Sequence, residues 1–112
     1  RTTLDEIVEN LQVTLNARRG FSSARPDFGI DSFFSRHGSR DMLLVLRDEI
    51  LEEVKKEEPR LREPELELLG TDNKSELHLE LRALVDGKRR KLRIRFNTML
   101  YEVSVEAQRG GE

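Results

Sequence analysis

The sequence contains no cysteine and no tryptophan, and it has a single tyrosine among 112 residues. Without cysteine there is no disulfide framework, no thiolate nucleophile and no cysteine-based metal site. The two histidines, His37 and His78, lie far apart in the sequence, which argues against a zinc site. The longest uninterrupted apolar run, residues 42–46, is far shorter than the roughly 20 residues that span a bilayer. We therefore expect no cofactor, no metal and no membrane insertion.

Neither sign of charge is in excess, although 38% of the residues are charged. The 20 Lys and Arg nearly cancel the 22 Asp and Glu, which excludes whole-molecule attraction to nucleic acid or to an anionic membrane as a default. The length is that of one domain, and no signal-peptide pattern opens the chain. These features predict one domain over residues 1–107, a flexible tail over residues 108–112 and a cytoplasmic location.

Apolar residues spaced three or four apart predict two helices. The first covers residues 3–16, where Thr3 and Glu6 have the spacing of a capping box. The second starts at Ser39, a capping residue, and ends before Pro59, which lacks an N–H. The apolar stripes consist of Leu4, Ile7, Leu11 and Leu15 in the first helix and Leu43, Leu46, Ile50 and Val54 in the second. Between the helices, residues 17–38 have no periodicity, which predicts a long loop that contains Phe28, Phe33 and Phe34 and a short helical turn near residues 31–34.

After Arg60 the apolar period changes to two, which predicts strands. Leu66 and Leu68 belong to a first strand, and a last strand covers residues 101–106. Asp86 and Gly87 form a strong two-residue hairpin signal between the central strands. That turn predicts the pairs Leu81 with Leu92, Leu79 with Ile94, Leu77 with Phe96 and Glu80 with Arg93. The predicted fold is α+β: two main helices packed on an antiparallel β-meander of three to four strands, whose exposed edge is a template for another chain.

Two clusters of charged residues are candidates for binding. Glu58, Pro59 and Arg60 lie where the second helix meets the sheet; they are explained either by helix termination or by a stiff backbone that aims Arg60 at a carboxylate. Residues 16–20 follow the first helix, and their cations and glycine suit a helix C-terminus without excluding a docking role.

Two further functions receive less support from the residues. The carboxylates of Glu52, Glu53, Glu57 and Glu58 lie in a charge-rich helix end with no obvious apolar cleft, whereas a glycosidase needs two acids that flank a cleft. The basic residues 88–95 have few aromatic neighbours for stacking on bases, so a solvated strand face explains them better than a nucleic-acid site.

Three motifs together resemble the signature of a contractile-tail baseplate family. They are Leu15-Asn16-Ala17-Arg18-Arg19-Gly20, Pro26-Asp27-Phe28-Gly29-Ile30 and Glu58-Pro59-Arg60-Leu61. That family contains the small wedge subunit of contractile phage tails and TssE of type VI secretion systems. The resemblance implies a structural protein that attaches to TssF/TssG-like wedge proteins, templates a sheath subunit by strand pairing and is oligomeric within the assembled baseplate. The partner-binding residues that it implies are Asn16, Arg18, Arg19, Gly20, Pro26, Phe28, Gly29, Glu58, Pro59 and Arg60.

The resemblance also leads to expectations that can be tested. Arg60→Ala is expected to abolish wedge assembly and to leave the isolated fold largely intact. Phe28, Phe33 and Phe34 are expected to pack partly on this domain and partly on the partner. The alternative function is a tail-associated peptidoglycan hydrolase, because older labels for the family include tail lysozyme.

Overall fold

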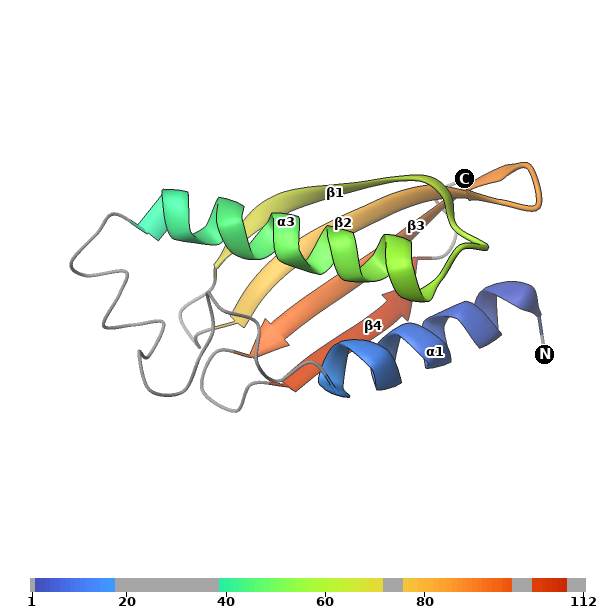
Figure 1. Cartoon of the computed structure of the whole chain (residues 1–112), viewed down its shortest axis with the longest axis horizontal. Coiled ribbons are helices and arrows are strands. Elements are labelled where there is room, and N and C mark those ends of the chain that lie inside the picture. Colours follow the sequence, from blue (N-terminus) through green and yellow to red (C-terminus); the bar gives the residue numbers. More distant parts are fainter. Residues whose placement is uncertain (1, 18–38, 72–75, 98–101, 109–112) are drawn as a thin grey trace.

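Two helices cover one face of a four-stranded antiparallel sheet in the computed structural model, which describes residues 2–17, 39–71, 76–97 and 102–108 (Figure 1). The elements are α1 (Thr3–Ala17), α3 (Ser39–Glu57), β1 (Arg62–Thr71), β2 (Glu76–Val85), β3 (Lys88–Asn97) and β4 (Glu102–Ala107). The strands lie in the order β1-β2-β3-β4, so each pairs with its neighbour in sequence. The predicted α+β class is confirmed, with four strands in the meander.

The central hairpin has the predicted turn and the predicted register. Asp86 and Gly87 both have positive φ, at 52° and 79°, as a type I′ turn requires. All four predicted pairs are found: Leu81 with Leu92, Leu79 with Ile94, Leu77 with Phe96, and Glu80 with Arg93. The register places the buried apolar residues of both strands on the helical face of the sheet and most of the charged residues on the open face, whereas Lys88 and Arg90, near the turn, lie on the helical face.

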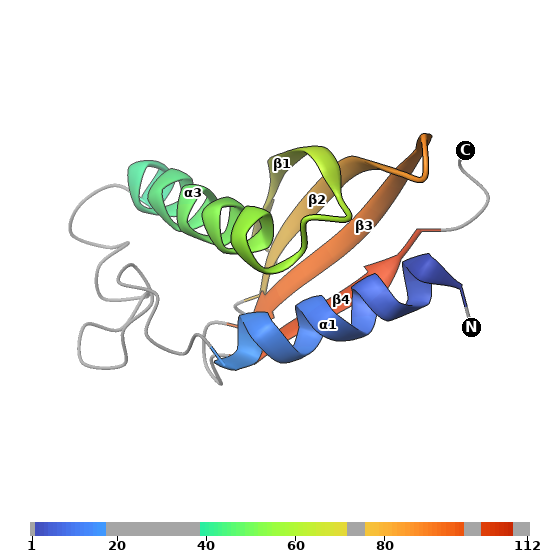
Figure 2. The ribbon, with the colours of Figure 1, turned by 45° about the vertical axis from the view of Figure 1, so that its right-hand side comes forward.

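The core lies between the helices and the inner face of the sheet. Within it, α1 packs along β4 and α3 packs over β1, and the turned view separates the two helices (Figure 2). The helices bury Ile7, Leu11, Leu15, Leu43, Leu46, Ile50 and Val54, and the strands bury Leu66, Leu77, Leu79, Leu81, Ala83, Val85, Leu92, Ile94, Phe96, Val103 and Val105. Leu4, the first residue of the predicted α1 stripe, is only partly buried.

The capping box of α1 lies one residue earlier than predicted. The hydroxyl of Thr2, not of Thr3, accepts the backbone N–H of Asp5 at 3.1 Å, and the Asp5 carboxylate accepts the N–H of Thr2 at 3.1 Å. The sequence offered two adjacent threonines, and the shorter acid at Asp5 suits this reciprocal pair as well as Glu6 would.

Several predictions fall outside the described residues. They concern the loop over residues 17–38 with its phenylalanines, the cap at the Ser39 side chain, Tyr101 at the start of the last strand, and residues 109–112 of the tail. Gln108, the first residue of the predicted tail, donates its backbone N–H to the carbonyl of Lys91 at 2.9 Å, so it continues the pairing of β3 with β4.

Candidate functional site

The Glu58-Pro59-Arg60 corner is a β-turn that joins α3 to β1. The N–H of Glu58 still donates to the carbonyl of Val54 at 2.9 Å, as in the last turn of a helix. The N–H of Leu61 then donates to the carbonyl of Glu58 at 3.2 Å, which closes a four-residue turn with Pro59 in its second position. Proline favours that position because its ring presets φ near −65°. Buried Leu61 anchors the far side of the turn in the core.

Within this turn, Glu58 is only 1% exposed and its carboxylate is fully engaged. Arg60 grips it with two parallel bonds, from Nε to Oε1 at 2.7 Å and from Nη2 to Oε2 at 2.9 Å, and the Arg60 backbone N–H adds a third at 3.3 Å. From α1, the Asn10 side-chain amide donates to Glu58 Oε2 at 2.9 Å and to the Glu57 carbonyl at 3.2 Å. The carboxylate therefore ties α1 to the end of α3.

These contacts decide the protonation of Glu58. Burial alone would raise the pKa of the carboxyl group, but the hydrogen bonds from Arg60 and Asn10 together with the Arg60 charge outweigh it and lower the pKa of Glu58 below its ordinary value of 4.5. A glycosidase acid needs the opposite, a raised pKa that keeps its proton near neutral pH. Glu58 is thus an ionised structural anchor, and its chemistry does not support the hydrolase alternative.

The lowered pKa predicts how stability depends on pH. At pH values between the lowered pKa of Glu58 in the folded state and its ordinary pKa in the unfolded state, the unfolded chain binds more protons than the folded one. Glu58 therefore adds stability that is fully present above about pH 4.5 and is lost as the pH falls through the pKa of the folded state. We expect the unfolding free energy of the wild type to fall more steeply below pH 4.5 than that of Glu58→Gln. Urea titrations from pH 3 to pH 7 would measure this, and parallel curves for the two proteins would contradict it.

Arg60 faces outward from the same turn, with 44% of its side chain exposed. Its Nη1 also donates to Glu6 Oε1 on α1 at 3.2 Å. A guanidinium has five N–H donors. Within the described part of the chain three of them are used, by Nε, Nη1 and Nη2, which leaves two. The corner therefore holds the Arg60 guanidinium in a fixed direction, with two N–H donors that no described residue uses.

Helix α1 carries a second polar pair on the opposite flank of its apolar stripe. Asn16 accepts the backbone N–H of Val103 at 2.8 Å and donates to the Val103 carbonyl at 2.9 Å, and Gln12 accepts the N–H of Val105 at 3.0 Å. These bonds occupy the outer edge of β4. The expectation of a bare edge is therefore wrong for β4, and Asn16, a predicted partner-binding residue, is engaged within its own chain.

The edge of β1 is different. Because backbone bonds alternate along antiparallel strands, the outward bonds of Val103 and Val105 fix the alternation across the whole sheet. When this alternation is followed from β4 through β3 and β2 to β1, the N–H and C=O groups of Leu66 and Leu68 lie on the outer side of β1. No hydrogen bond from the described residues reaches these groups. Among the described residues, one edge of the sheet is therefore closed and the other is open.

A family model for baseplate wedge protein gp25 matches residues 1–91, which include α1, α3, the corner, β1, β2 and the start of β3. The chain belongs to this family. The predicted resemblance is thereby confirmed, and with it a structural role in a baseplate. Comparison with curated proteins and with solved structures finds no match. Neither described helix of this wedge protein is long and apolar enough to cross a bilayer.

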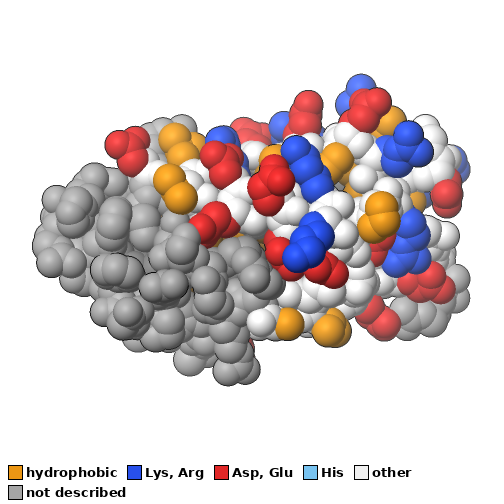
Figure 3. All heavy atoms as spheres, viewed as in Figure 1, with side chains coloured by type: hydrophobic (Ala, Val, Ile, Leu, Met, Phe, Trp, Pro, Cys, Tyr) orange, Lys and Arg blue, Asp and Glu red, His pale blue; other side chains and the backbone are white. Residues whose placement is uncertain are grey.

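The surface of the wedge protein carries both signs of charge close together. Acidic and basic side chains are interspersed over the helical side (Figure 3). On the open face of the sheet, Arg82 bonds Glu67 at 2.7 Å and Glu80 at 2.8 Å, and Arg95 lies 3.3 Å from Glu106. Carboxylates thus pair with two of the arginines on this face, Arg82 and Arg95, which weakens its attraction for a nucleic-acid backbone.

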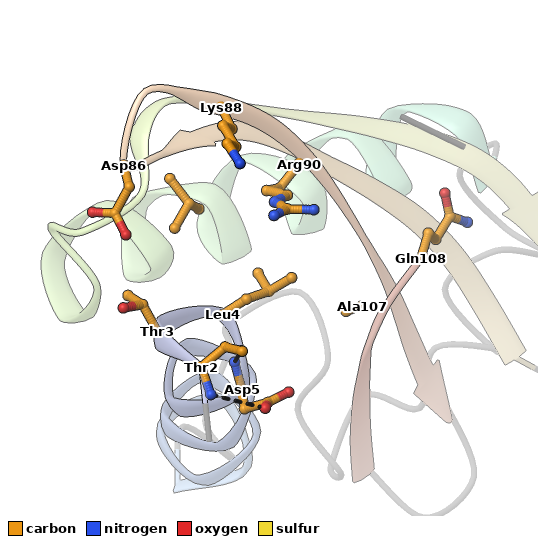
Figure 4. A pocket seen from close by; sticks show the side chains of 10 residues that line it. Thr2, Thr3, Leu4, Asp5, Asp86, Lys88, Arg90, Ala107 and Gln108 are labelled. Carbon is orange, nitrogen blue, oxygen red and sulfur yellow. Dashed lines mark hydrogen bonds between the residues drawn. The ribbon is translucent and has the colours of Figure 1, made fainter. Parts of the chain in front are cut away.

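A pocket of about 640 Å³ lies between the start of α1, the β2–β3 turn and the end of β4 (Figure 4). Its lining mixes Asp5, Asp86, Lys88 and Arg90 with small and apolar side chains, and it includes none of the predicted site residues. Among the residues that the structure describes, no group of three His, Asp or Glu side chains is placed to hold a metal ion.

The predicted site residues are thus only partly brought together. Glu58, Pro59 and Arg60 form one corner, and Asn16 lies on the β4 flank of α1. The other six, Arg18, Arg19, Gly20, Pro26, Phe28 and Gly29, lie outside the described residues. Sequence reasoning missed Asn10 and Gln12. Two signals were available in α1. Asparagine has a low helix propensity, and the i,i+4 spacing of Glu6 with Asn10 and of Gln12 with Asn16 puts one polar pair on each side of the apolar stripe of α1.

Proposed function

We propose that this wedge protein is a structural, non-catalytic subunit of a contractile injection machine, either a TssE-like component of a type VI secretion system or its phage-tail counterpart. It joins neighbouring wedge subunits and templates the sheath by strand pairing, on a cytoplasmic baseplate docked at a membrane or in a virion tail. The observation that carries the proposal is a half-exposed Arg60 whose direction is fixed by a buried carboxylate. That arrangement suits recognition of another protein better than chemistry.

The residues of the corner have different roles in this proposal. Glu58 does not contact the partner, because its oxygens are occupied within the chain. It positions Arg60, and Asn10 positions Glu58 from α1. Arg60 then offers its two remaining donors to a carboxylate or a carbonyl of a TssF/TssG-like wedge protein. Pro59 sets the turn. Arg18, Arg19, Gly20, Pro26, Phe28 and Gly29 remain proposed contacts of the same partner.

The sheath contact uses the outer edge of β1. A strand from a sheath subunit pairs with β1, because the outward backbone groups of Leu66 and Leu68 are unbonded among the described residues, whereas those of Val103 and Val105 are already satisfied. The two partners thus approach different parts of the molecule, one at the corner and one at the open edge.

Arg60→Lys tests the corner. Lysine keeps a positive charge beside Glu58 but lacks the planar fork that holds two bonds while presenting others. We expect affinity for the TssF/TssG-like wedge proteins of the same system to fall about tenfold, with circular dichroism and urea midpoint close to wild type. The matched control is Arg47→Lys in α3, where, within the described part of the chain, the arginine bonds the neighbouring exposed Asp48.

The measurement is a binding titration by fluorescence anisotropy or calorimetry on the purified proteins. Equal affinities for wild type, Arg60→Lys and Arg47→Lys would contradict the role of Arg60. Equal weakening by both substitutions, neither of which changes the net charge, would show that the loss of affinity does not come from the fixed corner.

A further inference from the structure

We propose that the strand accepted by the edge of β1 is basic: it alternates Lys or Arg on the open face of the sheet with apolar residues on the helical face. This inference rests on the proposed strand pairing at β1 and specifies the chemistry of the partner. It follows from the charges along the edge, from the length of edge that is regular, and from the residues that face inward.

The open face of β1 carries excess negative charge. Glu65 and Glu67 project there with 74% and 53% of their side chains exposed. Both lie on one cation, Arg82, at 3.6 Å and 2.7 Å, and Arg82 also bonds Glu80 at 2.8 Å. One guanidinium is therefore shared by three carboxylates, and only Glu80 has a second cation, Arg93, directly opposite it on β3, so negative charge is in excess at the edge.

The other cations of the open face do not pair with these two carboxylates. Arg89 and Lys91 on β3 line a shallow hollow together with Glu65, but among the described residues the ion pairs of Glu65 and Glu67 are with Arg82 alone. An added strand would lie only about 4.8 Å from β1 on its other side. Lys or Arg at its open-face positions would stand directly opposite Glu65 and Glu67, as the charged pairs of neighbouring strands do.

The backbone limits how much of the edge accepts a strand. Register shifts fall between Arg62 and Glu65 and between Leu68 and Gly70, and Glu63 has φ of 51° just before Pro64. Bulges of this kind twist an edge away from further pairing. The regular stretch is residues 65–68, so the incoming strand is short. On the helical face, partly buried Leu68 offers apolar surface for its inward side chain.

The same charges oppose a second copy of this chain. If two β1 strands paired antiparallel around Leu66, Glu65 of one copy would stand opposite Glu67 of the other. Like charges directly opposite one another on adjacent strands are destabilising. The β1 edge of one copy therefore repels the β1 edge of a second copy, whereas it attracts a basic strand.

The test uses two synthetic seven-residue peptides, one alternating Lys with Val and the other alternating Glu with Val. We expect the Lys peptide to bind the full chain about fivefold more tightly than the Glu peptide, and to protect the amides of Leu66 and Leu68 from hydrogen exchange. Glu65→Gln with Glu67→Gln should remove the difference. Glu102→Gln with Glu106→Gln, the same change of charge on exposed residues of closed β4, should leave it intact.

Each outcome has one meaning. Protection of Leu66 and Leu68 with equal affinities for the two peptides overturns the charge selection alone and keeps strand pairing at β1. Absence of protection by either peptide and by the strands of the sheath partner overturns strand pairing itself. Concentration-dependent dimers of the wild type in sedimentation, with protection at Leu66 and Leu68, would overturn the inference in favour of a second copy.

Discussion

Glu58→Ala should lower the unfolding free energy at pH 7 by about 3 kcal/mol. Glu58 is 1% exposed and accepts four hydrogen bonds, so its loss leaves Asn10 and Arg60 without their main acceptor and opens a cavity at the end of α3. It also unties α1 from that end. Urea unfolding followed by circular dichroism measures the effect. Glu52→Ala, on the exposed side of the same helix with 76% of its side chain exposed, should change the free energy by less than about 0.5 kcal/mol.

A double-mutant cycle shows whether the corner acts as a unit. We expect Glu58→Ala with Arg60→Ala to be about as stable as Glu58→Ala alone, because the second change removes a bond that no longer exists. Additive losses would contradict the coupling. Arg60→Ala alone leaves a buried carboxylate without its counterion, so the expectation that the isolated fold stays largely intact is revised: the variant should be less stable at pH 7 and approach wild type as Glu58 takes up a proton.

The strands were the most predictable part of the molecule. Asp86 and Gly87 allow a two-residue turn, and once that turn is fixed each pair of β2 with β3 follows by counting. A shift of one strand by one residue would have moved its leucines or isoleucine to the open face, so the apolar pattern excluded the odd shifts and the two-residue turn excluded the others. The turn residues and the alternation of apolar residues specify the same register, so the sequence was sufficient to predict the pairing of β2 with β3.

The site was less predictable because its contacts are long-range. Asn10 reaches Glu58 across 48 positions and Asn16 reaches Val103 across 87, and nothing in the local pattern specifies such partners. Before the fold is known, Glu58 is indistinguishable from the exposed glutamates of the same helix end. The turn itself was foreseeable from Pro59, whereas the burial of the carboxylate on one side and the exposure of Arg60 on the other were not.

The fixed direction of Arg60 and the closed edge of β4 both depend on α1, which also covers the core. Its apolar stripe is flanked by one polar pair that bonds the corner and by another that bonds β4. The helix thereby fixes the direction of Arg60 and closes the β4 edge of the sheet. In the proposed assembly the incoming strand is then left the edge of β1, whereas two open edges would allow chains of identical copies.

Asn16→Ala should lower the unfolding free energy by about 2 kcal/mol and open the edge of β4. The change removes the acceptor for the Val103 N–H and the donor to its carbonyl, both in part-buried positions. The exposed edge should then promote self-association, measured by light scattering as the protein concentration rises. Asn16→Asp keeps the acceptor but replaces the donor with a second oxygen facing the Val103 carbonyl, so it should be no more stable than the alanine variant.

The control is Val13→Ala, which changes a 69% exposed residue of the same helix and touches neither flank. It should leave both stability and association close to wild type, because an exposed helix position favours alanine slightly. If Asn16→Ala associates no more than Val13→Ala, the hydrogen bonds from α1 to β4 contribute stability but do not prevent association through the edge of β4. Association that persists after Leu66 and Leu68 are protected by a bound strand would locate the new contact at β4, as the closed-edge account requires.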